Sequence, residues 1–121
     1  MNIASLLMPE KTLSQEQREF TYMIAKFIEW AYSKGYELTF GHAWRDAETQ
    51  ARMVRLGLSK TLQSKHCDRL AVDFNLFIEG KYTDNPDDYL PLGKYWTETL
   101  GGGWGGDFKN FKDAGHFEYK K

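Results

Sequence analysis

The chain has 121 residues, of which 41% are hydrophobic, 16% aromatic and 27% charged. This length predicts one domain over residues 1–121, because domains cluster around roughly 100–150 residues. With 16 Lys and Arg against 17 Asp and Glu, the formal net charge is −1, which argues against a generally basic nucleic-acid-binding surface. A single cysteine, Cys67, excludes an internal disulfide framework and a Cys-only zinc site. A histidine-dependent site must therefore use His42, His66 or His116.

The start of the chain carries no targeting signal. Residues 1–9 have no basic segment, and their apolar run is shorter than the hydrophobic core of a secretory signal peptide. No stretch approaches the ~20 apolar residues that cross a membrane. We therefore expect a soluble protein made in the cytoplasm, without membrane insertion, that reaches a target outside the inner membrane only after release.

Residues 14–34 are expected to form the clearest helix. Ser14 and Gln17 have the spacing of a capping box, and Gly35 is a typical stop signal. Apolar side chains recur at steps of three and four residues, which predicts one buried face. The members of this stripe are Phe20, Met23, Ile24, Phe27, Ile28 and Ala31.

A strand and a second helix are expected next. Alternation over residues 36–41 predicts a half-buried strand. A helix is expected to open at Asp46 and to end near Gly57. The side chains expected to face inward from it are Ala47, Ala51 and Val54.

Residues 70–78 predict a central strand, followed by a tight turn over residues 79–82 and a short return strand. One face of the central strand would hold Val72, Phe74, Leu76 and Ile78; the other would hold Ala71, Asp73, Asn75 and Phe77. We further expect a short helix over residues 92–100, a glycine-rich loop over residues 101–106 and a last strand over residues 116–119. The pattern predicts an α+β fold, a small sheet with helices on one side.

Asp73 lies among apolar residues, where an isolated carboxylate is costly unless it is paired, protonated or bound to a metal. His66 precedes it by seven residues, and His116 can supply a third ligand. Imidazole and carboxylate are ordinary zinc ligands, and three protein ligands leave the fourth position that catalytic zinc requires. Spacing alone also allows a buried ion pair at Asp73, an exposed loop position for His66 and a backbone-bonded core histidine at His116.

Asp113 precedes His116 by three residues, so a turn would bring both to one point. A carboxylate beside a bound zinc ion can act as general base towards water. In a strand, Glu118 would share a face with His116 and could orient a neighbouring polar group. A turn-capping Asp113 and a solvated Glu118 are the simpler interpretations.

Three segments, in order, resemble a known family: Ser64-Lys65-His66, Ala71-Val72-Asp73 and Asp113-Ala114-Gly115-His116-Phe117-Glu118. They are similar to the zinc peptidases of peptidoglycan, which include D-alanyl-D-alanine carboxypeptidases and the L-alanyl-D-glutamate endopeptidases used as phage endolysins. The family pattern is Ser-x-His, then x-x-Gly-x-Ala-x-Asp, then a late acid-x-x-His. The resemblance spans residues 36–119.

The resemblance implies Zn²⁺ as the cofactor. The implied ligands are His66, Asp73 and His116. Asp113 would be the catalytic base, and Ser64 would contact the substrate. Arg45 matches an arginine that could bind a substrate carboxylate or stabilise the oxyanion; considered alone, it could instead form a surface ion pair with Asp46 or Glu48.

The resemblance also implies the fold and the substrate. We expect a small antiparallel sheet flanked by helices, as in DD-peptidases and hedgehog-like domains, in a monomer that acts on the peptidoglycan stem peptide. Asp113 as the late acid, the short chain and the missing export signal favour an endolysin-like L-alanyl-D-glutamate endopeptidase. The alternatives are a D-alanyl-D-alanine carboxypeptidase, a zinc-stabilised wall-binding module without turnover, and a domain whose His and Asp residues merely satisfy each other. Manganese or cobalt could occupy the same ligands.

Arg69 stands where the family has a glycine between the first two ligands. A positive φ there would strain an arginine, so we expect the local loop to differ, although an added cation would also suit an anionic substrate. Cys67 is expected to be a small half-buried side chain, and His42 to be spare. Trp104, in a glycine-rich loop without a phosphate-binding pattern, is expected to pack or to form a platform for substrate.

Overall fold

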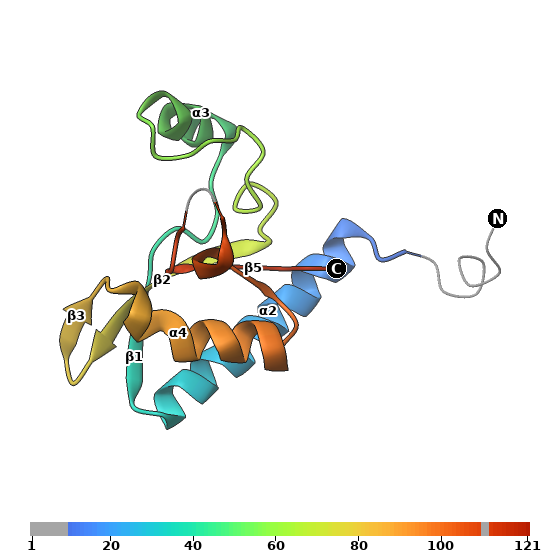
Figure 1. Ribbon diagram of the computed structural model, residues 1–121. Helices are drawn as coiled ribbons and strands as arrows, with labels where there is room; N and C mark the ends of the chain where they lie inside the picture. Colours follow the sequence, from blue (N-terminus) through green and yellow to red (C-terminus); the bar gives the residue numbers. More distant parts are fainter. Residues whose placement is uncertain (1–9, 110–111) are drawn as a thin grey trace.

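The computed structural model describes residues 10–109 and 112–121, so residues 1–9, which are expected to carry no targeting signal, lie outside the described residues. Figure 1 shows α3 apart from the other helices, with the sheet between α3 and the long helix α2. The elements are α2 (Leu13–Ser33), β1 (Tyr36–Phe40), α3 (Ala47–Arg55), β2 (Ala71–Ile78), β3 (Lys81–Thr83), α4 (Pro86–Lys94), the π-helix η1 (Tyr95–Thr99), β4 (Gly103–Trp104), the 3₁₀ turn η2 (Gly105–Asp107) and β5 (His116–Glu118). None of the described helices is long and apolar enough to cross a membrane.

β2 is the centre of an antiparallel sheet with the order β1-β2-β5-β4. β3 pairs with the last residues of β2 through the expected hairpin, in which Glu79 and Gly80 both have positive φ, as a two-residue turn of this kind requires. β5 pairs with the first residues of β2 and places His116 opposite Asp73. The small antiparallel sheet with flanking helices confirms the expected α+β fold.

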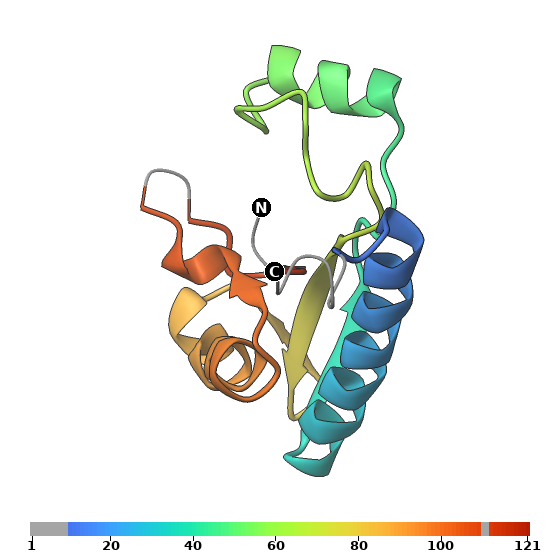
Figure 2. The same cartoon turned by 90° about the vertical axis from the view of Figure 1, so that its right-hand side faces the viewer.

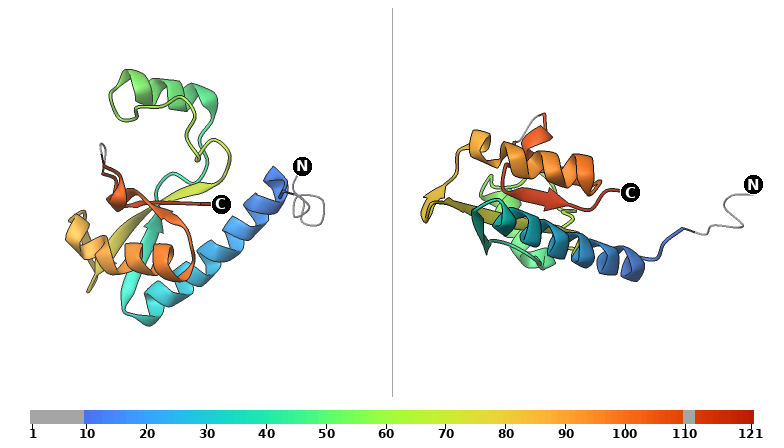
Figure 3. Two further views of the ribbon diagram at one scale, coloured as in Figure 1. Left: turned by 45° about the vertical axis from the view of Figure 1, so that its right-hand side comes forward. Right: turned by 90° about the horizontal axis from the view of Figure 1, so that it is seen from below.

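The hydrophobic core lies between one face of the sheet and two helical segments, α2 and α4–η1. The fully buried ring of Phe27 on α2 has its centroid 5.7 Å from that of Phe74, 4.7 Å from that of Phe117 and 5.4 Å from that of Trp96. Figures 2 and 3 show α2 and α4 along the sheet, with α3 beyond its end. The predicted apolar stripe of the first helix is confirmed. Because side chains alternate along a strand, the opposite face of the sheet carries Asp73.

The N-terminal cap of α2 lies two residues before the expected one. The Gln15 backbone N–H donates to Thr12 Oγ1 at 3.1 Å, and the Thr12 N–H donates to Gln15 Oε1 at 2.7 Å. Ser14 and Gln17, expected to form the capping box, lie inside the helix. That prediction was wrong because Thr12 and Gln15 have the same spacing two positions earlier. Gly35, with a φ of +87°, follows the last turn as expected.

α3 begins as expected, since Asp46 caps it by accepting from the Thr49 N–H at 2.6 Å. Its inward face was predicted wrongly: Ala47 is exposed, and Ala51 and Val54 are only half-buried. The one fully buried side chain of this helix is Gln50. α3 therefore lies over polar groups rather than over the hydrophobic core.

The last helix starts earlier than the predicted range 92–100. Asn85 caps α4 by accepting from the Asp87 N–H at 3.0 Å, and Pro86 occupies the first turn. Proline is favoured there because its missing N–H would be unsatisfied anyway. The helix then continues into the π-helix η1, so Asn85 and Pro86 mark the start of one continuous helical segment.

Trp104 packs in the core and is not a platform for substrate. It lies on the short strand β4, where a loop was expected, and its indole N–H donates to the Ala114 carbonyl at 2.7 Å. Cβ atoms at Gly93 and Gly106 would lie 2.2 and 2.3 Å from its ring, so neither position can take a larger residue without movement. Two of the glycines around this segment are therefore needed for packing.

Candidate metal centre and cleft

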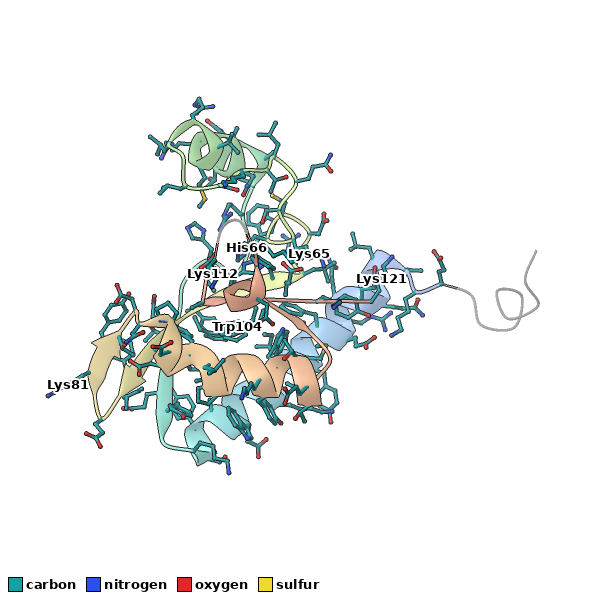
Figure 4. All side chains as sticks on the ribbon, in the orientation of Figure 1. Lys65, His66, Lys81, Trp104, Lys112 and Lys121 are labelled. Atoms are coloured by element: carbon teal, nitrogen blue, oxygen red, sulfur yellow. The ribbon has the colours of Figure 1, made fainter. Side chains whose placement is uncertain are left out.

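Three side chains converge on the face of the sheet opposite the core. Asp73 and His116 face each other through the β2–β5 register, and His66 comes from the turn that precedes β2. His66 Nε2 lies 3.1 Å from Asp73 Oδ1 and 3.2 Å from His116 Nδ1, and the latter two atoms are 3.3 Å apart. In Figure 4, His66 lies between α3 and the sheet. We call these three atoms the ligand triangle.

The ligand triangle fits a tetrahedral metal ion. Zinc bonds of about 2.0–2.1 Å place two ligand atoms about 3.3–3.4 Å apart, close to each edge of the triangle. His66 and His116 are buried and Asp73 is half-buried, so the three ligand atoms are largely withdrawn from water. Two imidazoles and one carboxylate are a donor set that suits Zn²⁺.

The electrostatics of the triangle also favour a cation. Burial opposes the charged forms, but the hydrogen bonds from His116 and His66 outweigh it and hold the pKa of Asp73 well below its usual range. Burial likewise lowers the pKa of His116, yet Asp73 and Glu118 more than compensate and raise it to about 9. The negative charges of Asp73 and Glu118, which favour protonated His116, would also favour a bound cation.

Glu118 sets the orientation of His116. The His116 Nε2–H donates to Glu118 Oε1 at 2.7 Å, which leaves the Nδ1 lone pair directed into the triangle. Lys65 Nζ in turn lies 3.1 Å from Glu118 Oε2 and donates to the Tyr119 carbonyl at 2.6 Å. The expectation that Glu118 shares a face with His116 and orients a polar neighbour is met, and that neighbour is His116 itself.

Asp113 lies at the start of the turn that leads into β5. The His116 N–H donates to the Asp113 carbonyl at 3.1 Å, so the predicted turn exists. Burial raises the pKa of the Asp113 carboxyl, and the negative charge of Asp73 raises it further. A carboxylate in this environment is a stronger proton acceptor than a solvated one.

A cleft of about 400 Å³ opens in front of the ligand triangle. All six predicted site residues line it: Arg45, Ser64, His66, Asp73, Asp113 and His116. Its far wall is formed by Met53 of α3 and by residues 58–61. Ser64 Oγ accepts from the His66 N–H at 3.2 Å, so the serine also shapes the turn that presents His66.

Arg45 is not the surface residue that its flanking acids suggested. Its side chain is 5% exposed, and Nη2 lies 3.7 Å from Asp73 Oδ2. Nη1 donates to Gln50 Oε1 at 2.7 Å. The ion pair considered with Asp46 or Glu48 is thus replaced by one with Asp73.

Gln50 and Phe108 line or support the site without having been predicted. The ring centroid of Phe108 lies 5.5 Å from that of His116, and Phe108 also borders the cleft. No spacing or motif marks Phe108. A weak signal existed for Gln50, because the inward face expected for its helix had only small or β-branched side chains.

The residues near the triangle that were set aside behave differently from one another. Cys67 is half-buried and His42 is exposed, with its ring centroid 6.4 Å from that of His66; neither belongs to the triangle. Arg69 has a left-handed backbone, with a φ of +58°, so this arginine carries the strain considered for a positive φ at this position. The Arg69 guanidinium lies 4.7 Å from the centroid of the Trp44 ring, a contact that a glycine could not make.

Comparison with known proteins places this cleft in a family. A family model described as D-alanyl-D-alanine carboxypeptidase matches residues 58–119, which include the whole ligand triangle and Asp113. An L-alanyl-D-glutamate peptidase of Listeria phage A118 is 33% identical over 97 residues, covering 78% of this chain and 34% of that protein. The chain thus spans about a third of the length of this relative.

The fold has a counterpart among solved structures. The L-Ala D-Glu endopeptidase ChiX of Serratia marcescens superposes with a TM-score of 0.69 at 22% identity, over 97% of this chain and 95% of that one. This likeness supports the architecture from α2 to β5. Since the family model covers just over half of the chain, the protein belongs to the peptidase family described as D-alanyl-D-alanine carboxypeptidase.

Proposed function

We propose that this chain is a zinc metallopeptidase that cleaves the peptidoglycan stem peptide between L-alanine and D-glutamate, as a phage endolysin does. The observation that carries the proposal is the ligand triangle of His66, Asp73 and His116, which opens onto a cleft that also holds Asp113. The family match supports a peptidase, and the printed activity of the Listeria phage relative supports this bond. We further propose that the protein acts as a monomer, on the cell wall after release, and binds no nucleic acid.

The ligand triangle would supply Lewis-acid chemistry. A Zn²⁺ ion held by His66, Asp73 and His116 would polarise the scissile carbonyl and lower the pKa of a coordinated water to about 7. Glu118 keeps His116 in the tautomer that such binding requires, because it accepts the proton of Nε2. Lys65 holds Glu118 in place from the other side.

Asp113 is the proposed general base. Its carboxylate accepts a proton from the attacking water and then returns that proton to the leaving amine. Burial, together with the negative charge of Asp73, raises the pKa of the Asp113 carboxyl. The Asp113 carboxylate is therefore a stronger proton acceptor than a solvated one. One group can therefore serve both proton transfers within the cleft.

Arg45 and Ser64 are the proposed substrate contacts. The guanidinium is held at the cleft by Gln50 and Asp73, where it can pair with a carboxylate of the stem peptide or with the oxyanion that forms during attack. Ser64 lines the same cleft, next to His66. Free carboxylates and D-residues in the stem peptide would explain why the site uses both.

Mass spectrometry of digested muropeptides tests this function. An endopeptidase releases a peptide that begins with D-glutamate and leaves L-alanine on the glycan, whereas a carboxypeptidase removes only the terminal D-alanine. The description of the family model makes the carboxypeptidase the second candidate. Loss of the terminal residue alone would therefore replace the first proposal by the second.

Metal dependence is tested with matched histidine variants. Chelation should abolish cleavage, and added zinc should restore it. His66→Ala should lose both stoichiometric zinc and activity, whereas His42→Ala, which alters an exposed ring outside the triangle, should keep both. Full activity after exhaustive chelation would refute zinc catalysis, and wall binding with zinc but without product would indicate a non-catalytic module.

A further inference from the structure

Gln50 is a polar side chain that is fully buried on a helix with no other buried residue. Its amide is bonded on both sides. Oε1 accepts from Arg45 Nη1 at 2.7 Å, while Nε2 donates to the Thr61 carbonyl at 2.5 Å and to Ser59 Oγ at 2.9 Å. Buried polar groups that are fully satisfied in this way are held in one arrangement.

The partners of Gln50 demand an amide in one orientation. A guanidinium can only donate and a backbone carbonyl can only accept, so the side chain between Arg45 and Thr61 must offer an acceptor to one and a donor to the other. Glutamate would turn a second acceptor towards the Thr61 carbonyl. Methionine, of similar length, would offer neither group. The position therefore selects glutamine by its chemistry and not by size alone.

Arg45 depends on this contact for its placement. Its guanidinium reaches Asp73 only at 3.7 Å, and its Nε is buried without a partner among the described residues. The 2.7 Å bond to Gln50 is thus its one short side-chain contact in the part of the chain that the structure describes. Ser59 and Thr61, at the other end of the amide, line the cleft opposite the ligand triangle.

We propose that Gln50 is a positioning residue, which holds Arg45 against the ligand triangle and ties it to the Ser59–Thr61 wall of the cleft. The proposal rests on the proposed function for its catalytic consequence. Without the amide, Arg45 would sample several rotamers, and the wall would lose its link to the guanidinium. Preorganised groups lose about 10²-fold in rate when misplaced by about 1 Å.

Gln50→Met should lower kcat/KM for stem-peptide cleavage by about 10²-fold while zinc content stays at one per chain. Gln50→Glu should act as the conservative rescue: its carboxylate still accepts from Arg45, so kcat should stay within about fivefold of wild type. Because that variant loses the donor to Thr61, its remaining defect should appear in KM. Gln17→Met is the matched control, since it removes one exposed hydrogen bond, to the Asp68 carbonyl.

A double-mutant cycle separates positioning from a general structural role. In an Arg45→Ala background, Gln50→Met should reduce kcat/KM by less than about twofold, because the residue through which it acts is gone. An equal loss in both backgrounds would overturn the proposal. So would a Gln50→Glu variant as impaired in kcat as Gln50→Met.

A spectroscopic readout does not depend on turnover. In the zinc-loaded protein without substrate, the Arg45 Nε–H should give a ¹⁵N–¹H signal protected from exchange, identified by its loss in Arg45→Lys. The signal should persist in Gln50→Glu and in Gln17→Met and disappear in Gln50→Met. An unchanged Arg45 signal in Gln50→Met refutes the positioning role, whereas absence of stem-peptide cleavage by wild type refutes the proposed function alone.

Discussion

The two sides of the cleft are stabilised by different kinds of interaction. The sheet with α2 and α4–η1, which we call the body, buries Phe27, Leu76, Trp96 and Phe117 completely. Residues 46–64, which we call the α3 lobe, contain one buried side chain, the polar Gln50. Figure 2 shows the ribbon of the lobe apart from that of the body, with the chain leading from one to the other at both ends of the lobe. The body thus relies on apolar burial, and the lobe on a small hydrogen-bonded network.

The body and the lobe therefore contribute different parts of the candidate site. The ligand triangle depends on the pairing of Asp73 with His116, and that register is secured by the core on the other face of the sheet. A metal site needs such rigid support. The lobe instead supplies the far wall of the cleft, where a substrate must enter and leave. Substitutions in the body should therefore mainly lower stability, whereas substitutions in the lobe should mainly lower activity.

The strongest test compares one large side chain from each region. Phe27→Ala removes a ring that contacts Phe74, Phe117 and Trp96, and should lower the free energy of unfolding by about 3–5 kcal/mol. Leu58→Ala in the lobe, at a side chain 58% exposed, should change it by less than about 0.5 kcal/mol. Urea denaturation measures both. Similar losses would show that the lobe has an apolar core of its own.

Asp113→Asn should separate activity from stability at the edge of the body. We expect kcat to fall by about 10²–10⁴, the usual contribution of a general base. The folded-state pKa of Asp113 is raised, by burial first and by Asp73 second, so its charged form costs stability once the pH exceeds the ordinary value. The neutral amide should therefore leave the metal-free protein at least as stable near pH 7.

Stem-peptide cleavage and urea denaturation of the metal-free variant give the two readouts for Asp113. Asp113→Glu, which keeps a carboxylate, is the matched control for the loss of the base. Near-normal kcat in Asp113→Asn would remove this residue from the mechanism. A clear drop in stability would mean instead that the carboxylate supports the turn that leads to His116.

The contrast between the regions also explains how far sequence alone could reach. The body was predictable because apolar periodicity marks α2 and β2, and because a carboxylate at Asp73 conflicts with that pattern unless it has a partner. The caps were harder, since Thr12 and Ser14 both start an acceptable capping box.

The contacts of the α3 lobe could not be predicted from apolar periodicity. Gln50 serves Arg45, which is close in sequence, but also the backbone carbonyl of Thr61, and no side-chain pattern reveals a backbone acceptor. At Arg69, the left-handed backbone comes with stacking on Trp44, a residue far from it in the sequence. Both are long-range consequences of how the lobe rejoins the body.

Tyr89 tests the body through pH. Its hydroxyl donates to the Phe74 carbonyl at 2.7 Å, and burial first, then nearby negative groups, raise its pKa to about 12. A raised folded-state pKa means that this contribution is fully present below about pH 10 and is lost as the pH rises towards 12. Tyr89→Phe should cost about 1–3 kcal/mol at neutral pH, because it leaves the buried carbonyl unpaired.

Denaturation of wild type and Tyr89→Phe between pH 8 and pH 12 tests whether the contribution of the Tyr89 hydroxyl to stability falls as the pH rises. The difference in unfolding free energy should shrink as wild type loses its contribution above about pH 10. Tyr22→Phe, at an exposed tyrosine on α2 that does not contribute to the pKa shift of Tyr89, is the control and should show little difference throughout. A constant gap across this range would indicate that the Tyr89 hydroxyl titrates alike in the folded and unfolded protein, and so that folding does not raise its pKa.

The smallest effect is expected at Arg69, where the lobe rejoins the body. Arg69→Gly removes the cost of a left-handed side-chain-bearing residue, about 1–2 kcal/mol. It also gives up the stacking on Trp44, about 0.5–1 kcal/mol at an exposed site, and makes the unfolded chain more flexible by a similar amount. These terms nearly cancel, so stability should change by less than about 1 kcal/mol.

Arg69→Ala loses the stacking and keeps the backbone cost, and should be less stable than Arg69→Gly by a few tenths to about 1 kcal/mol. The order of the two variants, measured by urea denaturation, therefore reports the backbone conformation at this junction: alanine equal to or above glycine would mean that residue 69 does not hold a positive φ in solution.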